Sequence, residues 1–380
     1  MPVLLTKSIT LLKRFSSMTR VPLQKKSALT VILSFISFLV IIAASSELVA
    51  RTPWVEKISP YRSVGNYDYQ FEIKWFRLQD YVKQNGGVDV IILGSSMVNT
   101  GIDPDVMAEA FFEQTGVKLR IFNFGVEGLT VAPNSVIAGI LVERYQPALL
   151  IYVTEMREFV AGSGLDYETR FLADPWLRYE RGDFNLSGWA VDHSAALQHY
   201  LPYQNWMRAD FLETQPNYLQ RMRVTTASGY ELDSKIGQNI DATPDPNNPD
   251  DAENFAAYQN FQIDSSRLNN LQSILDLRQT GETTLLVVEM PVHPTFYAFV
   301  GGEAVHQQFQ QTLTAFVEAN GGSFLPAETC NNIPPEGRSN RWHLNYLGAP
   351  IFSKCLGQQL SILADLQNTY FVHVNMGSSK

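Results

Sequence analysis

Short apolar segments alternate with longer segments of helical periodicity along most of the chain after residue 87. Strands that are buried on both faces of a parallel sheet are nearly continuous apolar runs, and helices connect them. The alternation therefore predicts an α/β fold with a parallel sheet that helices cover on both faces. We expect strands at Val88–Leu93, Leu119–Phe124, Ala148–Thr154 and Thr284–Val288, and helices at Tyr69–Val82, Asp105–Thr115, Asn134–Tyr145, Ser265–Gln279, His306–Ala319 and Gly348–Ala364.

The N-terminal part of the chain carries a basic tail followed by one long uncharged segment. Residues 1–26 contain six Lys and Arg residues and no acidic residue, and residues 28–46 contain no charged residue. A helix of this apolar length, roughly 28 Å, spans the hydrocarbon core of a bilayer, and basic residues before it favour a cytoplasmic N-terminus. We therefore expect a cytoplasmic tail over 1–26, a single-pass membrane anchor over 27–50 and an extracytoplasmic C-terminal domain. A buried core helix and a signal peptide cleaved near Ala50 are the alternatives.

The rest of the chain divides at changes in this pattern. Residues 51–87 form an aromatic-rich connector, and the α/β domain comprises residues 88–159 and 265–370. Residues 160–264 lack the alternation and are rich in Trp, Tyr, Asn, Asp and Pro. A segment of that length is too long for a plain connection in a compact domain, so we interpret it as an insertion that forms a lid or an acceptor groove.

The net charge bears on whether the protein binds nucleic acid, and the two cysteines bear on the compartment of the C-terminal domain. The net charge of −9 argues against a nucleic-acid partner, because such proteins present a basic face. The two cysteines, Cys330 and Cys355, could form a disulfide outside the cytoplasm, closing a loop of about 24 residues that stabilises by about 3 kcal/mol. Two separate buried thiols are the alternative.

Polar residues gather where the predicted strands end. In an open parallel sheet, ligands bind beyond the carboxyl ends of the strands. Taken singly, none of the candidates is a strong signal. Gly-Ser-Ser after a strand is most often a tight turn with a helix cap, and His343 alone is more often a structural histidine. The candidates are Ser95 and Ser96 after the first strand, Asn123 and Gly128 at the second, Arg157 after the third, His293 after the fourth, and Asn340 and His343 before the last helix.

Three segments in this order resemble blocks of the SGNH (GDSL-type) hydrolases. LGSSMVNTGIDP resembles the first block, in the Gly-Ser-Ser form of membrane-anchored relatives similar to the D-alanyl transfer protein of teichoic acid synthesis. FNFGVEGLT resembles the second block and NRWHLNYLGAPIFSKCL the fifth. The resemblance covers residues 88–160 and 283–365 and implies a flavodoxin-like three-layer sandwich.

The resemblance also implies roles for three residues. Ser96 would be the nucleophile and His343 its general base, because a hydroxyl is a weak nucleophile until a base takes its proton. The backbone N–H groups of Gly128 and Ser96 would form an oxyanion hole, in which one donor is typically worth about 2.7–4 kcal/mol at the transition state.

The sequence departs from the family pattern in two places. Asn340 occupies the position of the usual acid three residues before the histidine. An amide can orient the ring but cannot stabilise the imidazolium by charge, and in serine proteases the corresponding change costs about 10⁴ in rate. The third block also lacks its usual Asn. Arg157 could replace that donor and favour an anionic substrate, or it could form a salt bridge to Glu155 or Glu158.

The remaining histidines give weaker signals. His293 could bind substrate or act as an alternative base, or it could pack or cap a turn. The other four show no metal-ligand spacing, and no glycine-rich phosphate-binding motif follows a strand. We therefore expect no metal and no cofactor. Those four histidines are His193, His199, His306 and His373.

The expected function is a membrane-anchored serine esterase or O-acyltransferase acting on an envelope glycan or lipid. A transferase would also imply a membrane protein that donates the acyl group. The alternative, favoured by Asn340 and the missing Asn of the third block, is a catalytically impaired binding or scaffolding protein of an envelope assembly.

Overall fold

The computed structural model describes residues 28–161, 164–206, 211–258, 260–279 and 283–367. The chain forms two compact units, Met1–Pro60 and Tyr61–Lys380. In the first unit, helix α2 (Ala28–Ala50) is long and apolar enough to cross a membrane, a property that a signal sequence shares. The short helix α3 (Pro53–Ile58) follows it. The basic tail 1–26 lies outside the described residues.

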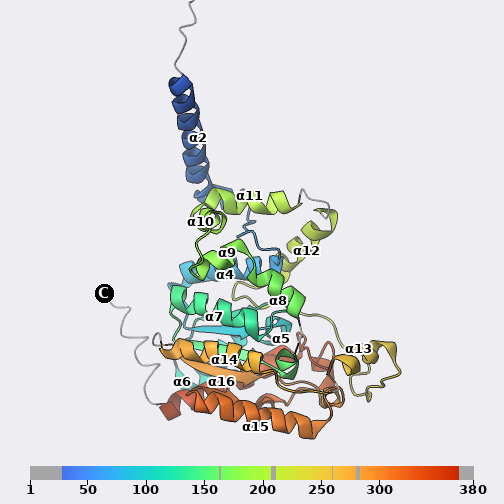
Figure 1. The fold of residues 1–380 in the computed structure, drawn as a ribbon. Helices are drawn as coiled ribbons and strands as arrows, with labels where there is room; N and C mark the ends of the chain where they lie inside the picture. Colours follow the sequence, from blue (N-terminus) through green and yellow to red (C-terminus); the bar gives the residue numbers. More distant parts are fainter. Residues whose placement is uncertain (1–27, 162–163, 207–210, 259, 280–282, 368–380) are drawn as a thin grey trace, which may run out of the picture. The chain divides into compact units, whose positions relative to one another are not determined.

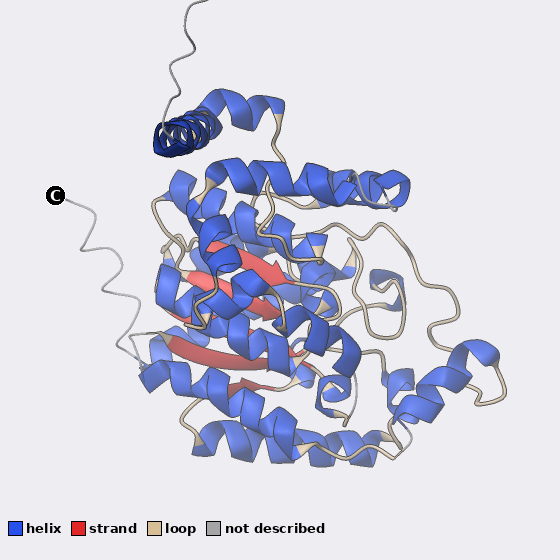
Figure 2. Cartoon of the chain, turned by 45° about the horizontal axis from the view of Figure 1, so that its top comes forward, coloured by secondary structure: helices blue, strands red, loops and turns tan. Residues whose placement is uncertain are grey.

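The second unit contains one sheet of five parallel strands (Figure 2). The strand order β2-β1-β3-β4-β5 is that of flavodoxin-like folds. This confirms the predicted α/β class. The fifth strand was not expected from the sequence, because its three half-buried residues are too few to form a recognisable apolar run. The strands are β1 (Val90–Gly94), β2 (Ile121–Gly125), β3 (Leu149–Thr154), β4 (Thr284–Glu289) and β5 (Ser323–Leu325).

Helices cover both faces of this sheet (Figure 1). Every residue of β1, β2 and β3 is buried, which is why these strands are nearly continuous apolar runs in the sequence, with Asn123 as the polar exception in β2. Helix α7 packs on β1 and β3 and against α14, and α6 packs on β2 and against α16. The covering helices are α6 (Pro104–Thr115), α7 (Val131–Tyr145), α14 (Ser265–Asp276), α15 (Glu303–Ala319) and α16 (Gly348–Gln367).

Helix α4 (Tyr69–Asn85) belongs to the core of the second unit, although the sequence placed it in a connector. Asp68 caps its first turn by accepting from the backbone N–H groups of residues 70 and 71. Phe71, Trp75 and Leu78 recur at helical spacing and are almost fully buried. Residues 51–87 therefore link two units and contribute a helix to the second.

The expected insertion is mostly helical in its first part. Its helix α8 packs beside α7, and α12 packs against α4. The insertion therefore adds helices beside both α7 and α4. The ring of Trp176 in α9 lies 4.6 Å from that of Trp75. The helices are α8 (Leu165–Leu172), α9 (Pro175–Glu180), α10 (Leu186–His193), α11 (Ala195–Trp206), α12 (Phe211–Val224) and α13 (Pro249–Tyr258).

Residues 225–240 of the insertion form a non-helical segment that we call the strap. It begins at the outer edge of β2, the edge that pairs with no other strand of the sheet. There the backbone N–H of Asn123 donates to the carbonyl of Ser228 over 2.9 Å. It ends near the loop before α16, where the N–H of Gly237 donates to the carbonyl of Arg338 over 2.8 Å. The strap therefore follows the rim of the sheet on which the candidate residues lie.

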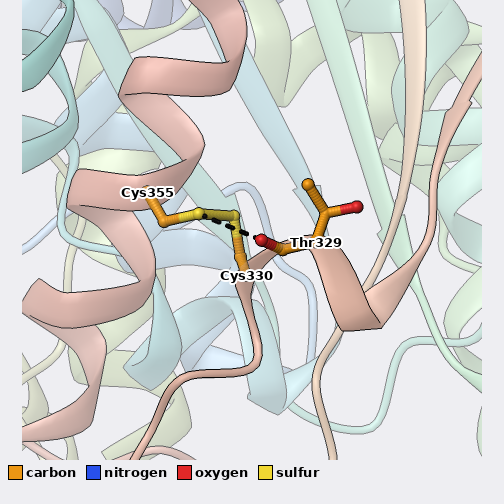
Figure 3. The surroundings of a disulfide bond; sticks show 3 residues. All are labelled: Thr329, Cys330 and Cys355. Carbon is orange, nitrogen blue, oxygen red and sulfur yellow. Dashed lines mark hydrogen bonds between the residues drawn. A yellow bond between two sulfur atoms is a disulfide. The ribbon is translucent and has the colours of Figure 1, made fainter.

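Cys330 and Cys355 form a disulfide bond (Figure 3). Cys330 ends the 3₁₀ helix η4 (Ala327–Cys330), and Cys355 lies in α16. The bond closes a loop with a sequence separation of 25 and joins α16 to the chain that precedes its loop. The structure thus selects the disulfide over two separate thiols.

Candidate functional site: a Ser–His pair at the rim of the sheet

Ser96 and His343 lie in hydrogen-bond contact although 247 residues separate them. Ser96 begins the short helix α5 (Ser96–Gly101) directly after β1, and its Oγ lies 2.8 Å from Nε2 of His343. The turn before it requires Gly94, which has φ 158° and no room for a side chain. A Cβ there would lie 2.6 Å from the carbonyl oxygen of Val153. The tight turn is what presents the hydroxyl at the rim.

The loop that carries His343 is fixed from both sides. The backbone N–H of Ser339 donates to the carbonyl of His343 over 3.0 Å, which closes the loop on itself. Thr100, one helical turn after Ser96, donates through its hydroxyl to the carbonyl of Leu344 over 3.3 Å. These contacts hold the imidazole against the start of α5.

Asn340 orients the imidazole through its side-chain amide. Its Oδ1 accepts from the backbone N–H groups of Trp342 and His343 over 3.0 and 2.8 Å, which fixes which end of the amide is oxygen. Its Nδ2 therefore faces Nδ1 of His343, 3.0 Å away. An amide nitrogen can only donate, so Nδ1 must accept and the ring proton lies on Nε2. In this tautomer His343 donates to Ser96 rather than accepting its proton.

The surroundings of His343 keep it neutral. Burial, and then the positive charges of Arg157 and Lys235, lower its pKa to about 3. A neutral histidine is the form that a general base requires. The Asn340 amide, however, favours the tautomer that has no free lone pair on Nε2.

The turn that contains Gly128 lies against the end of β1. The N–H of Val126, at the start of this turn, donates to the carbonyl of Gly94 over 3.0 Å. Gly128 has φ 79°, a conformation that favours glycine, and the ring of Tyr167 in α8 lies 3.6 Å from the position a Cβ would take. No hydrogen bond among the described residues uses the N–H of Gly128.

Arg157 makes the expected salt bridge and also lies beside the pair. It follows β3 in the 3₁₀ helix η1 (Met156–Phe159), and its Nε lies 2.6 Å from Oε1 of Glu155. Its guanidinium lies 4.8 Å from the centre of the Trp342 ring, next to His343. It also approaches the sulfur of Met97, next to Ser96, at 3.3 Å. The salt bridge to Glu155 is therefore present, and the role of Arg157 as a donor to substrate stays a prediction.

Asn123 does not reach the site, in contrast to the expectation that it contacts substrate. Its side chain is fully buried, and its Nδ2 donates to the carbonyls of Val98 and Ile102, each over 2.7 Å. Its Oδ1 accepts from the N–H of Gly125 over 2.8 Å. Asn123 thus joins α5 to β2 and has no atom available for a ligand.

His293 is a cap and not a partner of Ser96. It precedes the 3₁₀ helix η3 (Pro294–Ala298), and its Nδ1 lies 2.8 Å from the hydroxyl of Thr295. Its Nε2 lies 3.0 Å from a carboxylate oxygen of Asp241. Both ring nitrogens are therefore engaged away from the pair. Ser95 caps α5 with its backbone carbonyl, which accepts from the N–H groups of residues 98 and 99.

Three other histidines, His193, His199 and His306, form hydrogen bonds away from the Ser96–His343 pair. His306 is buried and bonded to Glu289 at 2.6 Å, His199 contacts the carbonyl of Tyr61, and His193 contacts that of Trp189. His373 lies outside the described residues. Within the described part of the chain, no group of three or more His, Cys, Asp or Glu side chains is placed to hold a metal ion.

Lys235 and the strap border this site, although no local pattern in the sequence indicates it. The carbonyl of Lys235 accepts from Nδ2 of Asn345 over 3.0 Å, and that of Asp233 accepts from the N–H of Tyr346 over 2.8 Å. Contacts between residues more than a hundred positions apart leave no local pattern. Only the folded chain shows that the insertion borders the pair.

Comparisons with known proteins assign no family. No family model and no curated protein matches the chain. A Streptococcus pneumonia protein provisionally described as a platelet activating factor matches with TM-score 0.35 and 13% identity, covering 77% of this chain and 92% of that one. A Bacteroides fragilis protein provisionally described as an acylhydrolase matches with TM-score 0.34 and 12% identity, covering 76% and 98%. A gut microbial diltiazem-metabolizing enzyme matches with TM-score 0.34 and 10% identity, covering 71% and 47%. These similarities are too weak to assign a function.

Proposed function

We propose that this chain is a membrane-anchored, extracytoplasmic serine esterase or O-acyltransferase that acts on an envelope glycan or lipid. The observation that carries the proposal is the 2.8 Å contact between Oγ of Ser96 and Nε2 of His343 at the carboxyl ends of the strands. The apolar helix α2 supports the membrane anchor, and a disulfide is typical of a compartment outside the cytoplasm.

The reaction would proceed through an acyl-enzyme. The oxygen of Ser96 attacks the acyl carbonyl while its proton passes to Nε2 of His343, and the leaving alcohol takes that proton back. The N–H groups of Gly128 and Ser96 would stabilise the oxyanion. Water then releases the acid in an esterase. In a transferase an acceptor hydroxyl takes the acyl group, and a membrane protein could supply the acyl donor.

This step requires the tautomer of His343 that Asn340 disfavours. The proton must move to Nδ1, where it would face the N–H₂ of Asn340 rather than an acceptor. The corresponding amide in serine proteases lowers the rate by about 10⁴ for this reason. We therefore expect slow acyl transfer, unless a substrate rearranges the amide.

A second candidate function follows from the same amide. In the Nε2–H tautomer the pair is a satisfied hydrogen bond, which is the arrangement that a binding or scaffolding protein of an envelope assembly would retain. The insertion would then carry the function.

A fluorophosphonate probe distinguishes the two functions. The probe labels an activated serine, and mass spectrometry of the full chain in nanodiscs would locate the adduct. Labelling of Ser96 that is lost in His343→Ala supports the enzyme. The absence of labelling in folded protein, beside a labelled control hydrolase, contradicts it and favours the binding protein.

His293→Ala is the matched control. It removes an imidazole from the same rim that contacts Thr295 and Asp241 rather than Ser96. We expect it to leave the labelling of Ser96 unchanged.

A further inference from the structure

Exposed apolar residues lie on two hydrogen-bonded segments next to the Ser–His pair. They come from two segments that are distant in sequence, the strap and the start of α16. Their side chains are between 37% and 50% exposed, which is unusual for large apolar residues gathered at one place. The apolar ledge, as we call this set, consists of Leu232, Ile236, Tyr346, Leu347 and Ile351.

Hydrogen bonds hold the two halves of the apolar ledge together. The N–H of Tyr346 donates to the carbonyl of Asp233, next to Leu232, over 2.8 Å. Asn345 is fully buried, and its Nδ2 donates to the carbonyl of Lys235 while its Oδ1 accepts from the N–H of Leu347 over 2.9 Å. One buried amide thus joins the strap to the start of α16.

The segments that carry the apolar ledge adjoin the reacting pair. His343 is three residues before Tyr346, and the intervening Leu344 accepts a hydrogen bond from Thr100 of α5. Lys235, between the two strap members of the ledge, lies near enough for its charge to lower the pKa of His343. We infer that a molecule that reacts at Ser96 can extend onto these exposed apolar residues.

We propose that the apolar ledge receives the hydrocarbon chain of an acyl ester whose carbonyl reacts at Ser96. This inference rests on the proposed function and narrows its substrate class to long-chain acyl esters, as opposed to acetyl or aminoacyl esters. Each methylene removed from water tightens binding about fourfold, so a chain along the ledge gains affinity with every added carbon. Lys235 disfavours a cationic amphiphile and favours a neutral or anionic one.

The test compares alkyl fluorophosphonates of increasing chain length on the full chain in nanodiscs. We expect the dodecyl reagent to label Ser96 at least tenfold faster than the ethyl reagent. The double variant Leu232→Ser/Ile236→Ser should lose about tenfold in rate with the dodecyl reagent and keep its rate with the ethyl reagent. Ile362→Ser is the control, because Ile362 is 50% exposed on the same helix α16 but outside the ledge.

The failures of the two proposals differ. Equal labelling by all chain lengths, or a double variant that behaves like Ile362→Ser, overturns the ledge and leaves the serine enzyme in place. If no reagent labels Ser96, the serine enzyme fails. A dodecyl diazirine probe then tests the ledge without chemistry at Ser96. The ledge is supported if photoadducts form on residues 232–236 and 346–351 and disappear in the double variant. The ledge is overturned if all photoadducts lie on other residues.

Discussion

Nδ2 of Asn340 lies 3.0 Å from Nδ1 of His343, and the backbone N–H groups of residues 342 and 343 leave this amide no other orientation. A carboxylate in that place would accept from Nδ1–H and hold Nε2 ready to take a proton from Ser96. The amide has the opposite effect, because it places the ring proton on Nε2. One residue thus determines whether the Ser96–His343 contact is a catalytic pair or a resting hydrogen bond.

Asn340→Asp should activate the serine. The carboxylate would accept from Nδ1–H and restore the tautomer that a general base needs, so we expect fluorophosphonate labelling of Ser96 to rise by up to about 10⁴-fold. Stopped-flow labelling with a fluorescent probe measures the rate. Asn340→Asp/Ser96→Ala is the control for labelling elsewhere. An unchanged rate in a variant that unfolds at the wild-type temperature would contradict the tautomer argument.

The pH dependence of labelling should also change in Asn340→Asp. In the wild-type protein the His343 pKa of about 3 keeps the ring neutral at higher pH, so labelling should stay flat from pH 8 down to about pH 5. The carboxylate of the variant favours the imidazolium and raises this pKa towards its ordinary value of about 6.5. The variant should then lose labelling as the pH falls through that value. A wild-type profile that falls near pH 6.5 would show that His343 is less buried than this structure has it.

Glu158 should make the stability of the fold depend on pH. Its carboxylate is buried, Tyr152 and Thr154 donate to it, and burial raises its pKa to about 8. The unfolded state, in which the pKa of Glu158 is about 4.5, releases a proton that the native state still holds. The free energy of unfolding therefore falls as the pH rises from about 4.5 to about 8. Glu158→Gln removes the titration, and its free energy of unfolding relative to wild type should rise by about 3 kcal/mol between pH 5 and pH 8.

Urea unfolding of the full chain in mild detergent at several pH values tests the role of Glu158. Glu113→Gln, an exposed position on α6, is the matched control and should show no such trend. Parallel pH profiles of the wild type and Glu158→Gln would mean that Glu158 is ionised in the native state.

Reduction of the Cys330–Cys355 bond should destabilise the second unit. The bond closes a loop with a sequence separation of 25, for which the chain-entropy model gives about 3 kcal/mol. Urea unfolding with and without a reductant measures the difference. The Cys330→Ser/Cys355→Ser variant should unfold like the reduced protein and show no response to the reductant. A wild-type protein that is equally stable under both conditions would mean that the bond does not form in solution.

The sequence alone determined the fold class and most of its elements. Runs such as VDVIIL, ALLIYVT and TLLVV become strands because residues buried on both faces of a sheet are mostly apolar. Helices such as α6 and α15 were predicted to within three residues, because one apolar face at helical spacing marks each of them. Strand β5 escaped prediction because three half-buried residues carry no periodic signal.

The tertiary structure alone decided the state of the candidate site. The sequence could place Ser96 and His343 on one rim, because the carboxyl ends of parallel strands share an edge. It could not show that two backbone N–H groups orient the Asn340 amide. Nor could it show that the Asn123 side chain is hydrogen-bonded to backbone groups at α5 and β2, or that His293 caps a turn. Those outcomes depend on hydrogen-bond geometry between distant segments, and residue identity does not encode this geometry locally. For the same reason, only the folded chain brings the strap and α16 together beside the pair.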